Sequence, residues 1–153
     1  MKVCIGGTFN QFHKGHKLLI DKAIKKAGKK GYLFIGITEG SINTKKKNIK
    51  PFEERKKALK KYIGEKKTIP EIEIKPLKDK YGPSVDKDFN AIIVSPDTKI
   101  TADEINMKRK KIGKKPLDII QIPLVLADDG KPISSSRIAE KKINENGKIL
   151  KID

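Results

Sequence analysis

The sequence predicts an α/β fold, a single-domain doubly wound open sheet of parallel strands. Apolar runs of strand length alternate with helix-period patterns along the chain, which is typical of βα units. Residues 91–94 are apolar at every position, as expected for a strand that is covered on both faces. A length of 153 residues suits one hydrophobic core, and neither a repeat nor a linker divides the chain. We therefore expect residues 1–153 to form one domain.

The amino-terminal half is predicted to contain two strands, each followed by a helix. Residues 2–5 and 32–37 are apolar runs of strand length. Residues 16–27 place leucine, isoleucine and alanine on one face at helical spacing, and a glycine follows them. A second helix is expected over residues 51–64, opened by a proline that suits a first turn and closed by a glycine.

The carboxyl-terminal half continues the alternation. Three serines in front of the last apolar pattern are good N-cap residues for a final helix, and a glycine follows it. The predicted elements are a half-buried strand 71–75, a buried strand 91–94, a charged helix 101–112, strands 117–122 and 124–127, and a helix 137–146. Doubly wound sheets bind ligands outside the carboxyl ends of their strands, so the first loop and the last helix are expected to meet there.

The charge of the chain requires an anionic partner or another explanation. Thirty-six Lys and Arg residues face 19 Asp and Glu, for a net charge of +17. Aromatic residues make up only 5%, Trp is absent, and the lysines are spread along the chain. This pattern favours a lysine-rich surface of a heat-adapted kind, which also attracts phosphorylated small molecules, over specific nucleic-acid binding. A nucleic-acid-binding module stays open as the minority reading.

Composition also bears on location. No apolar run approaches the roughly 20 residues that a membrane span needs. The first residues enter a strand-like run directly, without the pattern of a secretory signal. We expect a cytoplasmic protein with no membrane partner. Cys4 is the single cysteine, which excludes an intramolecular disulfide, and its place in an apolar run predicts a small buried hydrophobe.

The most informative segment, residues 6–16, reads GGTFNQFHKGH. The glycines let the backbone turn tightly and approach a ligand, and free N–H groups of the following helix are expected to point to the same space. His13 and His16 add donors, and the field of a bound phosphate would raise their pKa from about 6.5. The segment matches neither a Walker loop nor the dinucleotide fingerprint. It predicts an anion site of its own kind.

A metal site is the competing reading of the two histidines. Imidazoles three residues apart can bind zinc, but structural zinc needs four ligands. No third ligand, such as a nearby cysteine, presents itself. We therefore predict phosphate contact and no protein metal site.

Two terminal motifs resemble the nucleotidyltransferase superfamily. They are Gly-Thr-Phe followed by His13-Lys14-Gly15-His16, and the Ile-Ser-Ser-Ser-Arg run at residues 133–137. Between them, residues 94–98, 105–109 and 116–119 look like the archaeal type of phosphopantetheine adenylyltransferase. The resemblance implies the reaction of ATP with 4'-phosphopantetheine to give dephospho-CoA and pyrophosphate, in coenzyme A biosynthesis, with Mg²⁺ as cofactor.

The resemblance also implies roles for particular residues. Thr8 would hold the acceptor phosphate. Lys50, the best-placed lysine of the loop 44–50, is predicted to join it, although a solvated charge run is the default interpretation of this loop. His16 and His13 would contact the triphosphate and, with Lys50, form the catalytic set. The nucleotide-binding set would comprise Gly7, Thr8, Phe9, His13, His16, Asn106, Arg109, Ser134, Ser135, Ser136 and Arg137. Simple helix capping is the alternative for the serines, and a solvated surface helix is the alternative for Asn106 and Arg109.

Two departures from the family pattern are visible. Asn10 stands where family members commonly have Asp after Gly-Thr-Phe, which leaves a metal role at this position in doubt. The Arg-Gly-x-Arg segment of the bacterial enzymes is missing, so contacts to the pantetheine tail stay unassigned. Sister enzymes, a cytidylyltransferase or a flavin mononucleotide adenylyltransferase, remain alternatives, although they usually end in an Ile-Ser-Thr-Thr type of motif.

Overall fold

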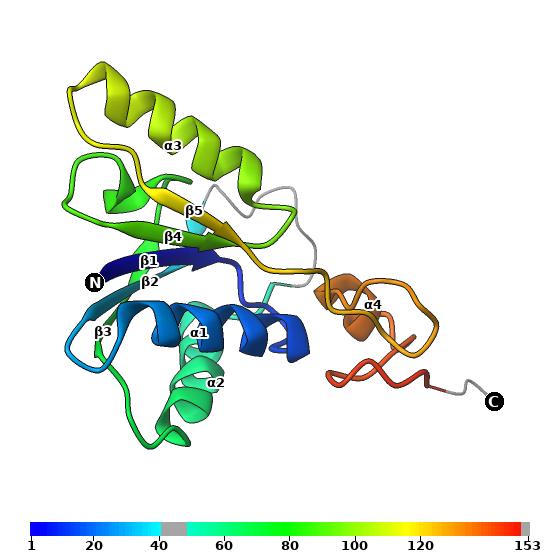
Figure 1. Cartoon of the computed structure of the whole chain (residues 1–153). Coiled ribbons are helices and arrows are strands. Elements are labelled where there is room, and N and C mark those ends of the chain that lie inside the picture. Colours follow the sequence, from blue (N-terminus) through cyan, green and yellow to red (C-terminus); the bar gives the residue numbers. More distant parts are fainter. Residues whose placement is uncertain (41–48, 151–153) are drawn as a thin grey trace.

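The structure is a computed structural model that describes residues 1–40 and 49–150. In this part of the chain, five parallel strands form one sheet in the order β3-β2-β1-β4-β5, as Figure 1 shows. The strands are β1 (Lys2–Gly7), β2 (Tyr32–Thr38), β3 (Glu71–Leu77), β4 (Ala91–Val94) and β5 (Asp118–Gln121). The helices are α1 (Lys14–Ala27), α2 (Phe52–Gly64), a 3₁₀ turn η2 (Gly82–Ser84), α3 (Lys99–Lys111) and α4 (Ser135–Ala139). The predicted fold class is confirmed.

The helices cover both faces of the sheet. Helices α1 and α2 lie on one face and α3 on the other (Figure 1). Successive side chains of β1 point to opposite faces of the sheet and therefore belong to different parts of the core. Val3 and Ile5 belong to the cluster under α1 and α2, and Cys4 belongs to the cluster under α3. Strand β1 pairs with β2 on one side and with β4 on the other. The strand order therefore reverses between β1 and β4, and such a switch point opens a crevice at the carboxyl ends of the strands.

Cys4 is a core residue. It is 1% exposed, and its thiol lies 3.7 Å from both the Ala91 carbonyl oxygen and the Ser84 hydroxyl. Burial raises the pKa of the thiol to about 11. The thiol stays protonated at neutral pH, which agrees with the predicted packing role.

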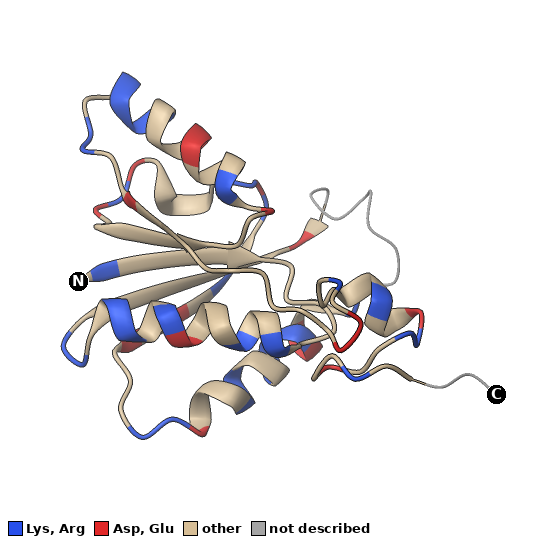
Figure 2. Ribbon diagram, turned by 45° about the vertical axis from the view of Figure 1, so that its right-hand side comes forward, with Lys and Arg blue, Asp and Glu red and all other residues tan. Residues whose placement is uncertain are grey.

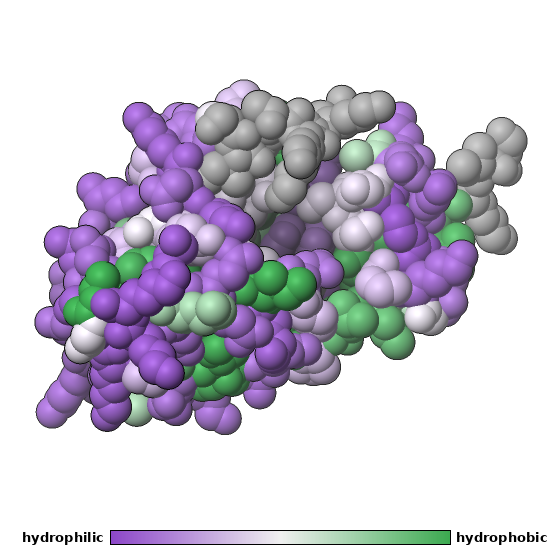
Figure 3. All heavy atoms as spheres, turned by 90° about the horizontal axis from the view of Figure 1, so that it is seen from above, coloured by the Kyte–Doolittle hydropathy of each residue, from purple (hydrophilic) through white to green (hydrophobic). Residues whose placement is uncertain are grey.

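The surface is charged throughout. Lys and Arg residues mark every α-helix and several loops and do not gather in one stripe (Figure 2). Seen from above, hydrophilic residues cover most of the surface and hydrophobic residues appear in separate groups (Figure 3). Across residues 1–40 and 49–150, no helix is long and apolar enough to cross a membrane.

Residues 124–127, predicted as a strand, form one arm of a tight hairpin. The sheet ladder ends where the Ile122 N–H donates to the Val94 carbonyl, because Pro123 has no N–H to continue it. The hairpin is closed by an isolated antiparallel bridge between Leu126 and Pro132. The strand prediction was wrong here, since an apolar run without a neighbouring strand to pair with does not extend a sheet.

The predicted last helix, residues 137–146, is also wrong in length. Helix α4 has five residues and ends because Lys141 adopts a left-handed conformation, with φ of 60°. The Lys142 N–H donates to the Arg137 carbonyl and the Lys141 N–H donates to the Ile138 carbonyl, which is a Schellman ending. The chain then turns back to bury Ile143 fully in a small satellite core. Burial of Ile143 outweighs the weak preference for continuing the helix.

Candidate functional site

A cleft of about 710 Å³ lies at the carboxyl ends of the strands, at the switch point. Its walls come from four segments: the loop after β1 with the start of α1, the turn after β4, the chain after β5, and α4. The lining includes Gly7, Thr8, Phe9, Asn10, His13, His16, Ser95, Asp97, Leu124, Val125, Ser134, Ser135 and Ser136. The structure thus brings together the two terminal motifs, which are more than a hundred residues apart in sequence, as expected for the first loop and the last helix.

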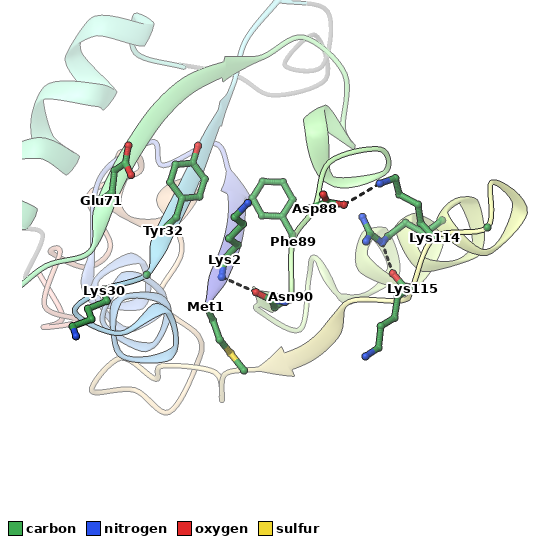
Figure 4. Close-up of a pocket in the computed structure, with 13 residues that line it drawn as sticks. Met1, Lys2, Lys30, Tyr32, Glu71, Asp88, Phe89, Asn90, Lys114 and Lys115 are labelled. Atoms are coloured by element: carbon green, nitrogen blue, oxygen red, sulfur yellow. Dashed lines mark hydrogen bonds and ion pairs between the residues drawn. The ribbon is translucent and has the colours of Figure 1, made fainter.

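A second hollow, of about 790 Å³, lies at the opposite, amino ends of the strands (Figure 4). Its lysines share the space with acidic side chains: the Lys114 ammonium lies 3.0 Å from the Asp88 carboxylate, and Glu71 lines the same hollow. The backbone N–H of Lys2 donates to Asn90 there. Both histidines of the chain lie at the other end of the sheet. Size alone does not identify a site, and we place the functional site in the cleft at the carboxyl ends.

The loop after β1 holds backbone strain. Phe9 and Gln11 have positive φ angles of 51° and 48°, a region that costs non-glycine residues on the order of 1–3 kcal/mol each. Burial of Phe9, which is 1% exposed, holds this shape, and its ring lies 5.3 Å from the His16 ring. Strain that packing enforces so locally is typical of functional loops.

The two histidines form a reciprocal cap at the start of α1. The Gly15 N–H donates to His13 Nδ1 over 3.0 Å, and the His13 N–H donates to His16 Nδ1 over 3.2 Å. The imidazole rings stack with centroids 3.7 Å apart. Because both Nδ1 atoms accept hydrogen bonds, the network assigns the proton of each neutral ring to Nε2. Each histidine can then donate one Nε2–H to an anion.

Gly15 is required by the position of the His13 ring. A Cβ at residue 15 would lie 2.9 Å from His13 Cε1 and 3.1 Å from Nδ1. Such contacts are shorter than the van der Waals distance, so a side chain there displaces the ring. The glycine between the histidines therefore serves the stacked pair and not a positive φ angle.

Burial keeps both histidines neutral in the free protein. It lowers the pKa of His13 to about 4, and burial together with the charge of His13 lowers the pKa of His16 well below its usual value. The sequence prediction that bound phosphate raises these pKa values stays a prediction, and any such rise must work against burial. The histidines can donate to phosphate without a rise in pKa, because each neutral imidazole already carries a proton on Nε2.

We expect His13 to titrate in the folded protein with a pKa of about 4, followed by its ring Cε1–H NMR signal between pH 8 and pH 3.5. Between pH 6.5 and 4, His13 is protonated in the unfolded chain but stays neutral in the folded protein, so the free energy of unfolding decreases as the pH falls. The difference between the two pKa values corresponds to a loss of about 3 kcal/mol in the free energy of unfolding. His13→Asn, which keeps a cap acceptor, should lose less stability over this range. A His13 midpoint near 6.5 would contradict the burial argument.

The amino terminus of α1 is less open than the sequence suggested. The Lys14 N–H donates to the Glu145 carbonyl over 3.0 Å, and the Gly15 N–H is occupied by His13. These groups are not free for a ligand in this structure. The imidazoles, at the positive end of the helix dipole, are therefore the donors that we assign to an anion, and contact through the remaining N–H groups, beginning near His16, stays a prediction.

The three serines combine capping with a place in the cleft. The Ser134 hydroxyl accepts from the Arg137 N–H over 3.3 Å, as the capping alternative predicted. The Ser135 hydroxyl donates to the Asn10 carbonyl, which joins α4 to the loop after β1. Ser136 is exposed and lines the cleft with the other two. Because α4 has only five residues, its dipole contributes less than a longer helix would.

Three residues predicted to bind nucleotide lie outside the cleft lining. The Asn106 amide pairs with both backbone groups of Leu117 over 2.8 and 3.0 Å. The Arg109 guanidinium is 3% exposed and donates to the carbonyls of Ser84, Val85, Lys87 and Lys115, at the amino ends of the strands. Arg137 donates to the Pro132 carbonyl and pairs with Asp129. In the unliganded protein their polar groups are engaged by the fold, and their contact with nucleotide stays a prediction.

Lys50 lies beside the cleft. Its neighbour Ile49 lines the cleft, and Lys50 itself lines an adjoining cavity of about 290 Å³ together with Phe9 and Phe12. The remaining residues of the predicted lysine loop, 44–48, lie outside the described residues. The structure therefore places Lys50 next to the motif loop, and its role stays a prediction.

Sequence reasoning assigned no role in the site to two walls of the cleft. Residues 95–98, noted above only as part of the resemblance, follow β4, and residues 122–125 follow β5. Ile122, Leu124 and Val125 give an apolar surface, on which a flat base can pack. The signal that would have found them was topological: in a doubly wound sheet, residues directly after the strands that flank the switch point face the ligand.

The cleft has few metal ligands. Asp97 and Glu140 line it, and Asn10 offers an amide in place of a carboxylate. Among residues 1–40 and 49–150, no group of three or more His, Cys, Asp or Glu side chains is placed to hold a metal ion. The donor set does not fit a dedicated metal site in this part of the chain.

Known proteins resemble the chain over almost its whole length. A family model described as cytidylyltransferase-like matches residues 4–141. A phosphopantetheine adenylyltransferase of Methanosarcina acetivorans is 44% identical over 97% of this chain and 95% of its own. Another, from Archaeoglobus fulgidus, is 40% identical over 98% of this chain and 100% of its own. A crystal structure of a protein of unknown function from Archaeoglobus fulgidus superposes with a TM-score of 0.71 at 38% identity, covering 80% of this chain and 89% of that one.

Proposed function

The chain belongs to the cytidylyltransferase-like family and, within it, to the archaeal phosphopantetheine adenylyltransferases, and we propose that it transfers the adenylyl group of ATP to 4'-phosphopantetheine. The products are dephospho-CoA and pyrophosphate. The observation that carries the proposal is the pair of stacked, neutral histidines in a cleft that the serine motif closes from the other side.

The chemistry is a direct displacement. An oxygen of the acceptor phosphate attacks the α-phosphorus of ATP, a new P–O bond forms, and the bond to the departing pyrophosphate breaks. No residue needs to form a covalent intermediate. The protein therefore acts by aligning the two phosphates and by stabilising the charge that develops between them.

The cleft offers donors for that charge. The Nε2–H groups of His13 and His16 are fixed by the cap network and donate to triphosphate oxygens, with His16 assigned to the α-phosphate. Thr8, whose hydroxyl accepts a hydrogen bond from Thr38, is assigned to the acceptor phosphate, with Lys50 beside it. Ser134, Ser135 and Ser136 supply hydroxyls towards the β- and γ-phosphates. Adenine packs on the apolar wall formed by residues 122–125.

We propose that Mg²⁺ arrives as the MgATP complex. Mg²⁺ commonly keeps several waters and binds through substrate phosphates with one or two carboxylates. Its contribution when bound is to neutralise charge on the triphosphate. The roles given to the chain's own residues do not depend on it. The cytoplasmic location expected from the sequence stays a prediction.

Pyrophosphate release by the purified protein tests the proposal. ATP and CTP are each offered with 4'-phosphopantetheine, flavin mononucleotide, nicotinamide mononucleotide or glycerol 3-phosphate, and unphosphorylated pantetheine is the matched control. We expect release with ATP and 4'-phosphopantetheine alone, because attack requires the acceptor phosphate. Release with another acceptor keeps the mechanism and rejects the substrate. Absence of release, with salt-sensitive nucleic-acid binding that His13→Ala leaves unchanged, would favour the binding-module reading.

A further inference from the structure

Arg55 is buried next to the cleft with its charge turned inward. It is the fourth residue of α2 and 3% exposed. Its Nε donates to the Lys50 carbonyl over 2.8 Å, and its Nη1 donates to the carbonyls of Thr8 over 3.0 Å and Thr38 over 2.6 Å. One guanidinium thus joins three chain segments at the carboxyl edge of the sheet.

The location of Arg55 is unfavourable for the helix that carries it. A cation in the first turn opposes the helix dipole, whereas Glu53 and Glu54 beside it obey the usual preference. Burial lowers the pKa of the guanidinium, and the charge of Glu39 opposes that shift. A local rule broken at a buried position, with bonds to the loop after β1, to the end of β2 and to the segment before α2, is the pattern expected of a residue kept for function.

Two of the three carbonyls belong to Thr8 and Lys50, the residues assigned to the acceptor phosphate, and the third belongs to Thr38 at the end of β2. Thr8 leaves β1 into the strained loop, and its hydroxyl accepts from the Thr38 hydroxyl over 3.2 Å. The Lys50 peptide is held from both sides, since its N–H donates to Asn10 Oδ1 over 3.0 Å and its carbonyl accepts from Arg55. Arg55 therefore fixes the distance between the backbones of Thr8 and Lys50.

We propose that Arg55 is a positioning residue for adenylyl transfer, which acts by holding Thr8 and Lys50 in register for the acceptor phosphate. The proposal rests on the proposed function. The planar fork of arginine reaches several carbonyls at once, whereas a lysine ammonium is a point donor on a flexible stem. Loss of the fork leaves the charge in place and lets the two acceptor-side segments move apart. Errors of about 1 Å in such alignment cost on the order of 100-fold in rate.

Ile63 provides a control for lost stability. It is buried on the same helix, at 7% exposure, but near the carboxyl end of α2 and outside the cleft lining. Arg55→Lys and Ile63→Ala are therefore both expected to lower thermal stability. Only the first should change catalysis.

The experiment measures kcat, the KM for 4'-phosphopantetheine and the Kd for ATP in full-length wild type and both variants, below their melting temperatures. Arg55→Lys is expected to lower kcat by roughly 10- to 100-fold and to raise the acceptor KM, with the ATP Kd changed less than about threefold. Ile63→Ala should keep all three constants. Wild-type kinetics for Arg55→Lys, or an equal loss in Ile63→Ala, would overturn the proposal.

A second variant keeps the test independent of folding. Asn10→Ala leaves Arg55 intact and removes the acceptor of the Lys50 N–H, so it should shift kcat and the acceptor KM in the same direction. Unchanged kinetics in Asn10→Ala would reject positioning through Lys50. If the wild type uses another acceptor, the proposed function fails, and the same comparison with that acceptor still decides the role of Arg55. A wild type without transfer to any acceptor overturns both.

Discussion

His16→Ala is expected to lower kcat for adenylyl transfer by roughly 100- to 1,000-fold, the cost of removing one preorganised donor to a developing anion. The Nε2–H of His16 is such a donor, because Nδ1 is held by the His13 N–H and the ring is packed between His13 and Phe9. The KM for ATP should change much less, since charge builds at the α-phosphate mainly in the transition state. Steady-state pyrophosphate release over a range of ATP concentrations measures both.

The variant also removes a structural bond, so stability needs a separate control. Without the His16 ring, the His13 N–H loses its acceptor, which costs about 1–3 kcal/mol if that group stays buried. His16→Gln restores an acceptor, since glutamine is a usual partner in a capping box. We expect His16→Gln to recover stability without recovering kcat, because its flexible amide does not reproduce the fixed Nε2–H. A kcat for His16→Ala within threefold of wild type would exclude the assigned role.

The sheet could be predicted because its strands are visible in the sequence as local apolar runs of strand length. Residues 91–94 were predicted and observed with the same bounds, since a fully apolar run of four residues fits the middle of a covered sheet. Helix ends were predictable where glycine marks them, as at the end of α2. The end of α4 was not, because Lys141 takes a left-handed conformation that sequence normally reserves for glycine. Packing of Ile143 against the satellite core decides that position, and no local signal reports it.

The site shows the same division between local and tertiary information. The histidines and glycines of the loop 6–16 could be selected from the sequence because they lie close together directly after the first strand. The arginines could not be placed in this way: Arg109 and Arg137 are predicted to bind nucleotide, and in the unliganded structure their guanidinium groups donate to carbonyls or to a carboxylate of the fold. Arg55 gave no signal beyond its place in a first turn. Whether a buried arginine holds backbone or substrate depends on which carbonyls surround it, and only the tertiary structure supplies them.

Gly15→Ala is expected to lower kcat by about 100-fold while changing the free energy of unfolding by only about 1 kcal/mol. The new Cβ would lie 2.9 Å from His13 Cε1, and the ring can yield because it is the end of a side chain. The ring would then leave its stacked position on His16 and misplace its Nε2–H, and misplacements of about 1 Å cost on the order of 100-fold. The higher helix propensity of alanine, about 1 kcal/mol in a helix interior, partly offsets the loss of the His13 acceptor by the N–H of residue 15.

Activity should therefore fall far more than stability, which a general packing defect does not produce. Gly64→Ala is the matched control, since Gly64 ends α2, an added methyl group there would meet no atom within 4 Å apart from its chain neighbours and its own helix backbone, and it lies outside the cleft lining. It should gain stability and keep kcat. Thermal melting and pyrophosphate release on both variants separate the effects. Unchanged kcat in Gly15→Ala would mean that the stacked arrangement of His13 is not needed for transfer, and the assignment of His13 to the triphosphate would fall with it.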